Sequence, residues 1–121
     1  MAPRITRFLG TTTTLTLHHT GRRNGAARET ELPFLEDGDN VVITAARGGS
    51  DLNPSWFHNL TATPEAAVTI GRKRRDVLAR VAEGEEREAL WPRLVEAIEE
   101  LAEFQARTER RIPVIVLEPR A

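Results

Sequence analysis

Cysteine and tyrosine are both absent from this chain of 121 residues, and the aromatic residues are few, with two tryptophans and four phenylalanines. The lack of cysteine excludes disulfides and thiolate chemistry, and it favours a cytoplasmic location. The lack of tyrosine excludes a phenol as a proton donor. No apolar run approaches the ~20 residues that a membrane helix needs, and the start MAPRITRFLG lacks the apolar centre of a secretory signal.

The remaining composition is that of a globular chain, with 40% apolar and 29% charged residues. The length allows one domain and is too short for two ordinary ones, so we predict a single domain over 1–121 with a short N-terminal segment, 1–14. The net charge of −1 provides no general attraction to nucleic acid, and we expect no such partner. Basic residues nevertheless crowd the first half and the run 72–75, and acidic ones gather in 83–103, which indicates a local anionic ligand.

The first two thirds of the chain have the pattern of short strands joined by turns. TTTTLTLHHT and AARETELPFL flank GRRNG, in which Asn24-Gly25 predicts a tight hairpin with positive φ angles. EDGDN precedes VVITAA, and GRKRR separates EAAVTI from DVLARVAE and is interpreted as a third hairpin turn with solvated charges. Three turns between five short runs favour an antiparallel meander or barrel.

The last third changes from strand to helix and back to strand. Apolar residues recur at helical spacing between positions 85 and 107, with Pro92 inside the pattern, so we expect a kink or break near Trp91. IPVIVLEP predicts a final strand, in which Pro113 requires an edge position or a strand start. The expected result is an α+β domain with a closing sheet and an acidic helix over it.

The segment TGRRNGAAR allows two interpretations. It is either an exposed hairpin with solvated arginines or a cradle for a phosphate or carboxylate, because arginine binds such groups with two parallel hydrogen bonds. The segment alone does not decide between them.

The segment AARGGSDLNPSWFHNL is a second candidate site. Two adjacent glycines allow a ligand close to the backbone, and Pro54 suits the first turn of a helix that Asn53 would cap. A helix N-terminus beside Arg47 favours negative charge. The alternative is that Trp56 packs in the core and His58 is structural.

Metal and hydrolase chemistry have weak support, and we predict no metal site. His18 and His19 are adjacent and would point to opposite faces of a strand, which makes a zinc site improbable. Ser50 and Ser55 lack the context of a nucleophile elbow.

Taken in order, the motifs TGRRNG, ARGGSDLNPSWFHNL, TPEAAVTIG, EGEEREALWPRLVEA and FQARTERRIPVIVLEP resemble the deazaflavin-dependent nitroreductase family, a branch of the flavin/deazaflavin oxidoreductases. The resemblance runs from about Leu15 to Pro119. It implies an antiparallel split β-barrel of the FMN-binding type, with a short helix after the Gly-Gly loop and a longer acidic helix before the last strand.

The resemblance also implies a site for coenzyme F420, a deazaflavin with an anionic phospholactyl-polyglutamate tail; FMN is the alternative cofactor. The cofactor-binding positions carried over from the family motifs are Arg22, Arg23, Asn24, Gly25, Arg28, Ala46, Arg47, Gly48, Gly49, Pro54, Trp56 and Asn59. Leu101 and Phe104 stand where the family often has substrate-side tyrosines. The N-terminal segment is short for the family, which leaves two alternatives open: a more open pocket, or a pocket completed by another subunit in a homodimer.

The function implied is hydride transfer from reduced F420 to a small electron-poor acceptor, a quinone, enone or nitroaromatic, with the catalytic residue left unassigned. Two alternatives stay open. One is a non-enzymatic carrier of F420 or of another anionic or lipid-like ligand, and the other is an FMN- or haem-binding relative on the same barrel.

Overall fold

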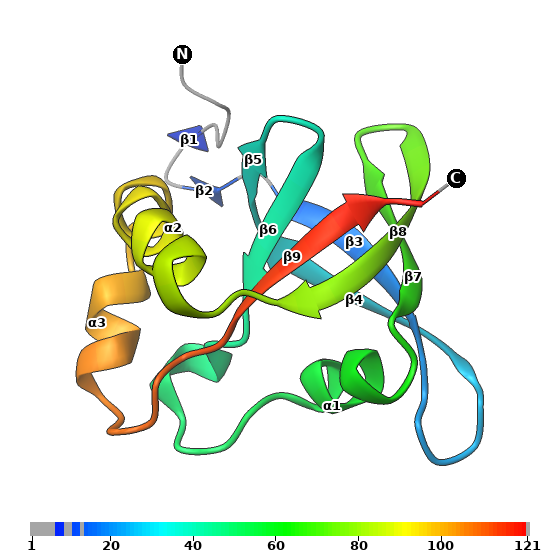
Figure 1. The fold of residues 1–121 in the computed structure, drawn as a ribbon, viewed down its shortest axis with the longest axis horizontal. Helices are drawn as coiled ribbons and strands as arrows, with labels where there is room; N and C mark the ends of the chain where they lie inside the picture. Colours follow the sequence, from blue (N-terminus) through cyan, green and yellow to red (C-terminus); the bar gives the residue numbers. More distant parts are fainter. Residues whose placement is uncertain (1–6, 9–10, 13, 121) are drawn as a thin grey trace.

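The computed structural model describes residues 7–8, 11–12 and 14–120, and its centre is a seven-stranded sheet in which every pairing is antiparallel (Figure 1). Across the sheet the strands are β4 (Ala27–Pro33), β3 (Thr14–Thr20), β7 (Glu65–Ile70), β8 (Lys73–Val81), β9 (Val114–Pro119), β6 (Asn40–Thr44) and β5 (Leu35–Asp37). Two short strands near the N-terminus, β1 (Arg7–Phe8) and β2 (Thr11–Thr12), pair with each other.

The order of the strands forces this sheet to curl. β4 and β5 lie at its two opposite edges, yet they are consecutive in the chain with only Phe34 between them. The two edges must therefore approach each other, and the sheet bends into a barrel whose edges are joined by the chain itself. This confirms the predicted split β-barrel, and it places the 3%-exposed ring of Phe34 in the barrel core.

Alternation along the strands divides the apolar side chains between two cores. In β6, Val41 and Ile43 point into the barrel, whereas Val42 faces outward. The outer core lies under α2 (Gly84–Ala97) and α3 (Leu101–Ala106), which cover one side of the sheet (Figure 1). The acidic helix therefore covers the sheet as predicted.

The third helix, α1 (Ser55–Ala62), lies at one end of the barrel (Figure 1). It inserts Trp56 and Leu60 into the inner core, where they are 6% and 3% exposed. Burying two large side chains fixes the orientation of this short helix, because eight residues are too few for a helix to be stable alone. None of the helices in the described part of the chain is long and apolar enough to cross a membrane.

Two of the predicted turns differ from the structure. β3 and β4 are joined by the loop 21–26 rather than by a two-residue turn, and only Gly25 of the Asn24-Gly25 pair has a positive φ, of 70°. Asn24 instead accepts a hydrogen bond from the Ala26 amide at 3.0 Å, so its side chain closes the loop. In GRKRR only residues 71–72 form the turn, since pairing with β7 extends β8 back to Lys73.

Of the kink or break predicted near Trp91, the break does not occur, and the kink stays a prediction. Pro92 lies inside a continuous α2, and the helical segment breaks at 98–100, where buried Ile98 adopts an extended backbone with φ −114°. Proline costs the helix a hydrogen bond, but the turns on either side hold it in place. Pro113 directly precedes β9, which lies between two neighbours, so the strand-start alternative is correct.

Candidate functional site

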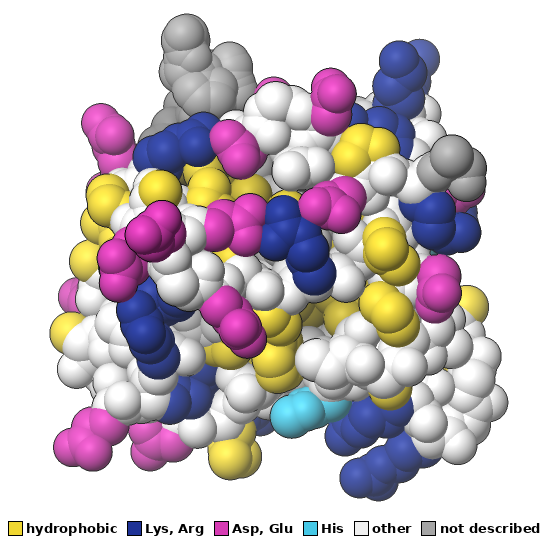
Figure 2. Space-filling view, in the orientation of Figure 1, with side chains coloured by type: hydrophobic (Ala, Val, Ile, Leu, Met, Phe, Trp, Pro, Cys, Tyr) yellow, Lys and Arg dark blue, Asp and Glu magenta, His cyan; other side chains and the backbone are white. Residues whose placement is uncertain are grey.

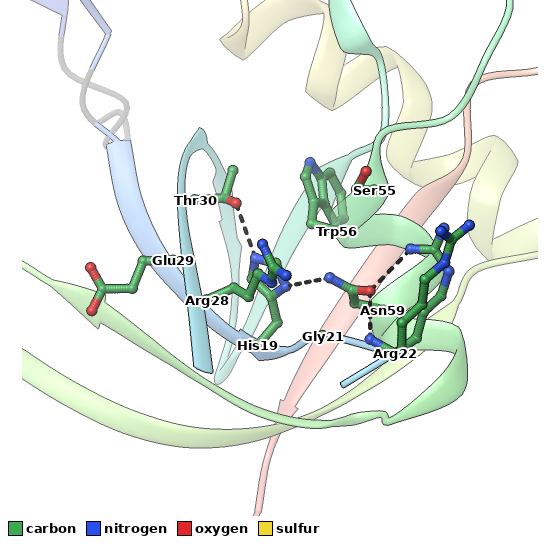
Figure 3. Close-up of a pocket in the computed structure, with 10 residues that line it drawn as sticks. His19, Gly21, Arg22, Arg28, Glu29, Thr30, Ser55, Trp56 and Asn59 are labelled. Atoms are coloured by element: carbon green, nitrogen blue, oxygen red, sulfur yellow. Dashed lines mark hydrogen bonds between the residues drawn. The ribbon is translucent and has the colours of Figure 1, made fainter. Parts of the chain in front are cut away.

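A pocket of about 510 Å³ lies between the β3–β4 hairpin and α1. Its walls are contributed by His19, Gly21, Arg22, Arg23, Arg28, Glu29, Thr30, Ser55, Trp56 and Asn59 (Figure 3). The space-filling view shows lysine and arginine side chains at the end of the molecule that carries this hairpin, whereas many acidic side chains lie over α2 and α3 (Figure 2). The pocket thus lies in one of the basic regions of a nearly neutral molecule, and the β7–β8 turn carries another.

Three arginines give the pocket its charge. Within the described residues, the side chains of Arg23 and Arg28 make no hydrogen bond or ion pair, so their donors are available to a ligand. The carboxylate of Glu29 extends away from the other labelled side chains (Figure 3), and one of its oxygens lies 3.4 Å from Nδ1 of His18. The pocket therefore favours an anion.

A partly buried chain of hydrogen bonds lines the pocket. Oδ1 of Asn59 accepts from the backbone amide of Arg22 at 3.0 Å and from its Nη1 at 3.1 Å. Nδ2 of Asn59 lies 3.1 Å from Nδ1 of His19, and Nε2 of His19 lies 3.0 Å from Oγ1 of Thr30. The chain joins three elements, because Asn59 lies on α1, His19 on β3 and Thr30 on β4 (Figure 3).

The environment of His19 lowers its pKa. Burial is the largest cause, and the positive charge of Arg28 and then the neighbouring His18 act in the same direction. The imidazole is therefore neutral at physiological pH.

Trp56 and Ser55 line the pocket from the first turn of α1. Trp56 belongs at once to the barrel core and to the pocket wall, which combines the two interpretations of this residue. The helix begins one residue later than expected: Pro54 is its N-cap, and the side chain of Asn53 is not a cap because it accepts a hydrogen bond from Arg110 at 2.7 Å.

The Gly-Gly loop is not part of this wall. Arg47–Gly49 forms a short 3-10 turn against α3, where Nη1 of Arg107 donates to the carbonyl of Gly48 at 3.2 Å. A Cβ on Gly49 would lie 2.8 Å from the carbonyl oxygen of Phe104. Packing against α3 therefore explains the glycine at position 49. A Cβ on Gly48 would meet nothing within 4 Å.

Arg110 holds this loop in place. Its Nε donates to the carbonyl of Ser50 at 2.8 Å, and Nη1 donates to Asn53. Its Nη2 lies within hydrogen-bond distance of three further backbone carbonyls, those of Ala45, Ala46 and Leu52. The guanidinium thus supplies hydrogen-bond donors to several loop carbonyls that are not paired in a helix or sheet.

Comparison with known sequences and structures assigns the chain to a family. The family model of the F420H(2)-dependent quinone reductases matches residues 2–119. The chain belongs to this family. Rv1261c of Mycobacterium tuberculosis, named an F420H(2)-dependent quinone reductase, is 35% identical over 116 residues, which cover 92% of this chain and 76% of that protein. Rv3178 of the same organism, provisionally named for the same activity, is 42% identical over 107 residues, 88% of this chain and 90% of its own length.

Solved structures agree with the quinone reductase family. An F420-H2 dependent reductase, FDR-A, is 37% identical with a TM-score of 0.82, over 88% of this chain and 94% of its own. A structure described as a domain-swapped dimer has the same identity and TM-score, over 88% of this chain and 80% of its own. The haem storage protein HutZ of Vibrio cholerae, at 15% identity and a TM-score of 0.69 over 90% of this chain and 82% of its own, shares the fold alone.

The pocket between the β3–β4 hairpin and α1 unites only some of the predicted residues. Arg22, Arg23, Arg28, Trp56 and Asn59 lie on its wall. The others, which do not line it, are Asn24, Gly25, Ala46, Arg47, Gly48, Gly49 and Pro54. Their contact with a cofactor stays a prediction.

The two substrate-side candidates lie on α3, away from this wall. Leu101 is 1% exposed in the outer core, and Phe104 packs against that core with Arg107 over its ring at 5.5 Å. Their role toward the acceptor also stays a prediction.

Sequence reasoning missed His19, Thr30, Ser55 and Arg110. A signal existed for His19, because Leu15 and Leu17 precede it at the spacing of one strand face, which leads inward. No local pattern marks Arg110, whose partners lie some 60 residues earlier in the chain. Among the described residues there is no group of three or more side chains suited to hold a metal ion.

Proposed function

We propose that this chain is an F420H2-dependent quinone reductase, which transfers a hydride from reduced F420 to a quinone. One observation carries the proposal beyond the family assignment: a pocket of about 510 Å³ whose wall holds two arginines without any partner among the described residues. Such unpaired cations fit a cofactor whose tail bears a phosphate and carboxylates.

The residues present fit this cofactor. Arg23 and Arg28 would hold the anionic tail, with Arg22 anchored beside them, and the largely buried Trp56 contributes an apolar part of the wall. When bound, the reduced deazaflavin supplies the hydride. The chain's own residues serve to bind the tail, orient the ring and shield one side of the site from water.

Quinone reduction to the hydroquinone consumes one hydride and one proton. No tyrosine can supply the proton, since the chain has none. The side chains of Ser55 and Thr30 bring hydroxyls to the pocket, and water reaches the exposed Ser55. These hydroxyls and solvent are the proton sources that this chain offers.

Fluorescence titration of the purified protein with F420, run beside FMN and haem, tests the proposal. We expect F420 to bind most tightly, because its tail carries the most negative charge. A short-chain quinone should then oxidise reduced F420 at a rate that depends on the protein. Binding without turnover across several quinones would favour the carrier alternative, and tighter binding of FMN or haem would favour the other.

We further propose that the chain acts in the cytoplasm as a homodimer. Two observations support the dimer: the 37%-identical structure described as a domain-swapped dimer, and the position of β4 as an edge strand with β3 as its only partner among the described residues. An unpaired strand edge is a common place for pairing with a second copy. Sedimentation velocity at several protein concentrations should reveal a species of twice the chain mass.

A further inference from the structure

A single chain of hydrogen bonds joins one side chain from each of three elements to an arginine of the β3–β4 loop: Thr30, His19, Asn59 and Arg22 (Figure 3). His19 and Asn59 are 6% and 3% exposed, two of the few polar side chains that are buried among the described residues. Buried polar groups are stable only when their hydrogen bonds are made, so the direction of each bond in this chain is constrained.

The directions follow from Arg22. Its backbone amide and its guanidinium are both donors, and both contact the same side-chain atom of Asn59 at 3.0 and 3.1 Å. That atom must be the oxygen, so the amide nitrogen of Asn59 faces His19. Because this nitrogen only donates, Nδ1 of His19 must be the acceptor, and the ring proton lies on Nε2 and points to Thr30.

This arrangement distinguishes Arg22 from the other arginines of the pocket. Asn59 holds both the backbone and one end of the Arg22 guanidinium, while Nε and Nη2 of Arg22 make no hydrogen bond within the described structure. Arg23 and Arg28 have no such anchor. Arg22 is therefore the cation that is already immobilised before a ligand arrives, which reduces the entropy lost on binding.

We propose that His19 is a positioning residue for anion binding: as a neutral acceptor at Nδ1, it fixes the Asn59 amide so that Asn59 presents Arg22 to the phosphate-bearing tail of F420. The inference rests on the proposed function for the identity of the ligand only. The lowered pKa of His19 is consistent with the neutral ring that the geometry requires.

Two substitutions separate the halves of the imidazole. In His19→Asn the side-chain oxygen reaches about as far as Nδ1, so it can still accept from Asn59 while the bond to Thr30 is lost. In His19→Gln the terminal amide reaches about as far as Nε2, so the contact with Thr30 can persist while Asn59 loses its acceptor. A merely structural histidine would make the two variants similar.

We expect His19→Gln to bind F420 about tenfold more weakly than His19→Asn, which corresponds to about 1.4 kcal/mol, the scale of holding one long side chain in place. His19→Leu also removes the acceptor and replaces it with a side chain that suits a core. It should match His19→Gln, and it serves if that variant does not fold. Equal affinities for the Asn, Gln and Leu variants would overturn the inference.

A thermodynamic cycle tests whether His19 acts through Arg22. In an Arg22→Ala background the Asn and Gln variants should bind F420 with about equal affinity, because the side chain being positioned is gone. A tenfold difference that persists there would show that His19 acts by another route and would refute the proposal.

Two further measurements keep this inference separate from the proposed function. The ¹⁵N shifts of the ring, recorded without ligand, should show the proton on Nε2 of His19; a proton on Nδ1 would overturn the inference. The affinities of the His19→Asn and His19→Gln variants are also compared for tripolyphosphate, a polyanion without a deazaflavin ring. If the wild-type protein binds tripolyphosphate but not F420, and the two variants differ about tenfold in their affinity for tripolyphosphate, the proposed function fails and the positioning role stands. If it binds neither anion, both fail.

Discussion

The guanidinium of Arg110 donates a hydrogen bond of 2.7 Å to the side chain of Asn53, directly before the residue that caps α1. Through the same guanidinium, the segment after α3 is joined to the carbonyls of the loop that leads from β6 to α1. Arg110 does not line the pocket, but it holds Asn53 and the loop that leads into the helix carrying Trp56 and Asn59. The position of the site therefore depends on a residue outside it.

Replacing Arg110 with lysine should lower the free energy of unfolding by about 1–3 kcal/mol, because one ammonium cannot satisfy several carbonyls at once. Chemical denaturation measures the change. Arg111→Lys is the matched control. The side chain of Arg111 is exposed, so this substitution should change the free energy of unfolding by less than about 0.5 kcal/mol. Equal effects of the two substitutions would contradict the role given to Arg110.

Gly49→Ala should destabilise the fold by about 1–3 kcal/mol, because a Cβ there would lie 2.8 Å from the Phe104 carbonyl oxygen at a backbone φ of 88°. Gly48→Ala shares the left-handed backbone, with φ 62°, but its Cβ would enter open space, and it should cost about 1 kcal/mol. Thermal unfolding of the pair isolates the packing against α3. If Gly48→Ala proves the more damaging, the explanation of Gly49 is wrong.

Arg23→Ala and Arg28→Ala should each weaken F420 binding by about 1.5–3 kcal/mol for every charged hydrogen bond lost, with little change in stability. Neither side chain has a partner among the described residues, so nothing in the fold depends on them. Arg72→Ala is the control: it removes an equally exposed charge from the β7–β8 turn, at the other end of the sheet (Figure 1), and should leave affinity unchanged. Fluorescence titration at two salt concentrations measures all three. A loss of affinity in the control would indicate a general charge effect.

The free energy of unfolding should fall as the pH drops through the range in which His19 titrates. Its pKa in the folded state is lowered by burial, Arg28 and His18, so below its ordinary value of 6.5 the unfolded chain binds a proton that the folded chain resists. The contribution of neutral His19 is thus complete above about pH 6.5 and is lost on acidification. Urea denaturation at about pH 7.5 and about pH 5.5 should show a smaller loss of stability for His19→Leu than for wild type. Equal losses would mean that His19 is not the group responsible for the pH dependence.

The strands and their turns could largely be predicted from the sequence, because both signals are local. Alternation placed Leu15 and Leu17 on one strand face, and Asp37 with Gly38 marked the β5–β6 connection. The predictions failed where one residue type is compatible with two local structures. Asn24 closes a longer loop with its side chain, and Pro92 is tolerated inside a helix held by its neighbours.

The site could be predicted only in part. The arginines of the β3–β4 loop and Trp56 lie together in the pocket. The sequence could point to them because the family resemblance covers the motifs that contain them. The glycines at 48 and 49 suggested ligand contact, because small residues after a strand allow either a ligand or another backbone to approach. The structure shows another backbone, that of α3, beside Gly49.

By itself, then, the amino-acid sequence determined the antiparallel strands, the helix that covers them and the basic character of one hairpin loop. These features follow from the spacing of residues that are neighbours in the chain. Only the tertiary structure decided that Asn59 would reach Arg22, 37 residues earlier, and that Arg110 would hold a loop some 60 residues away. Such contacts depend on how the sheet curls, and the curl is set by which strands become its edges rather than by any local pattern.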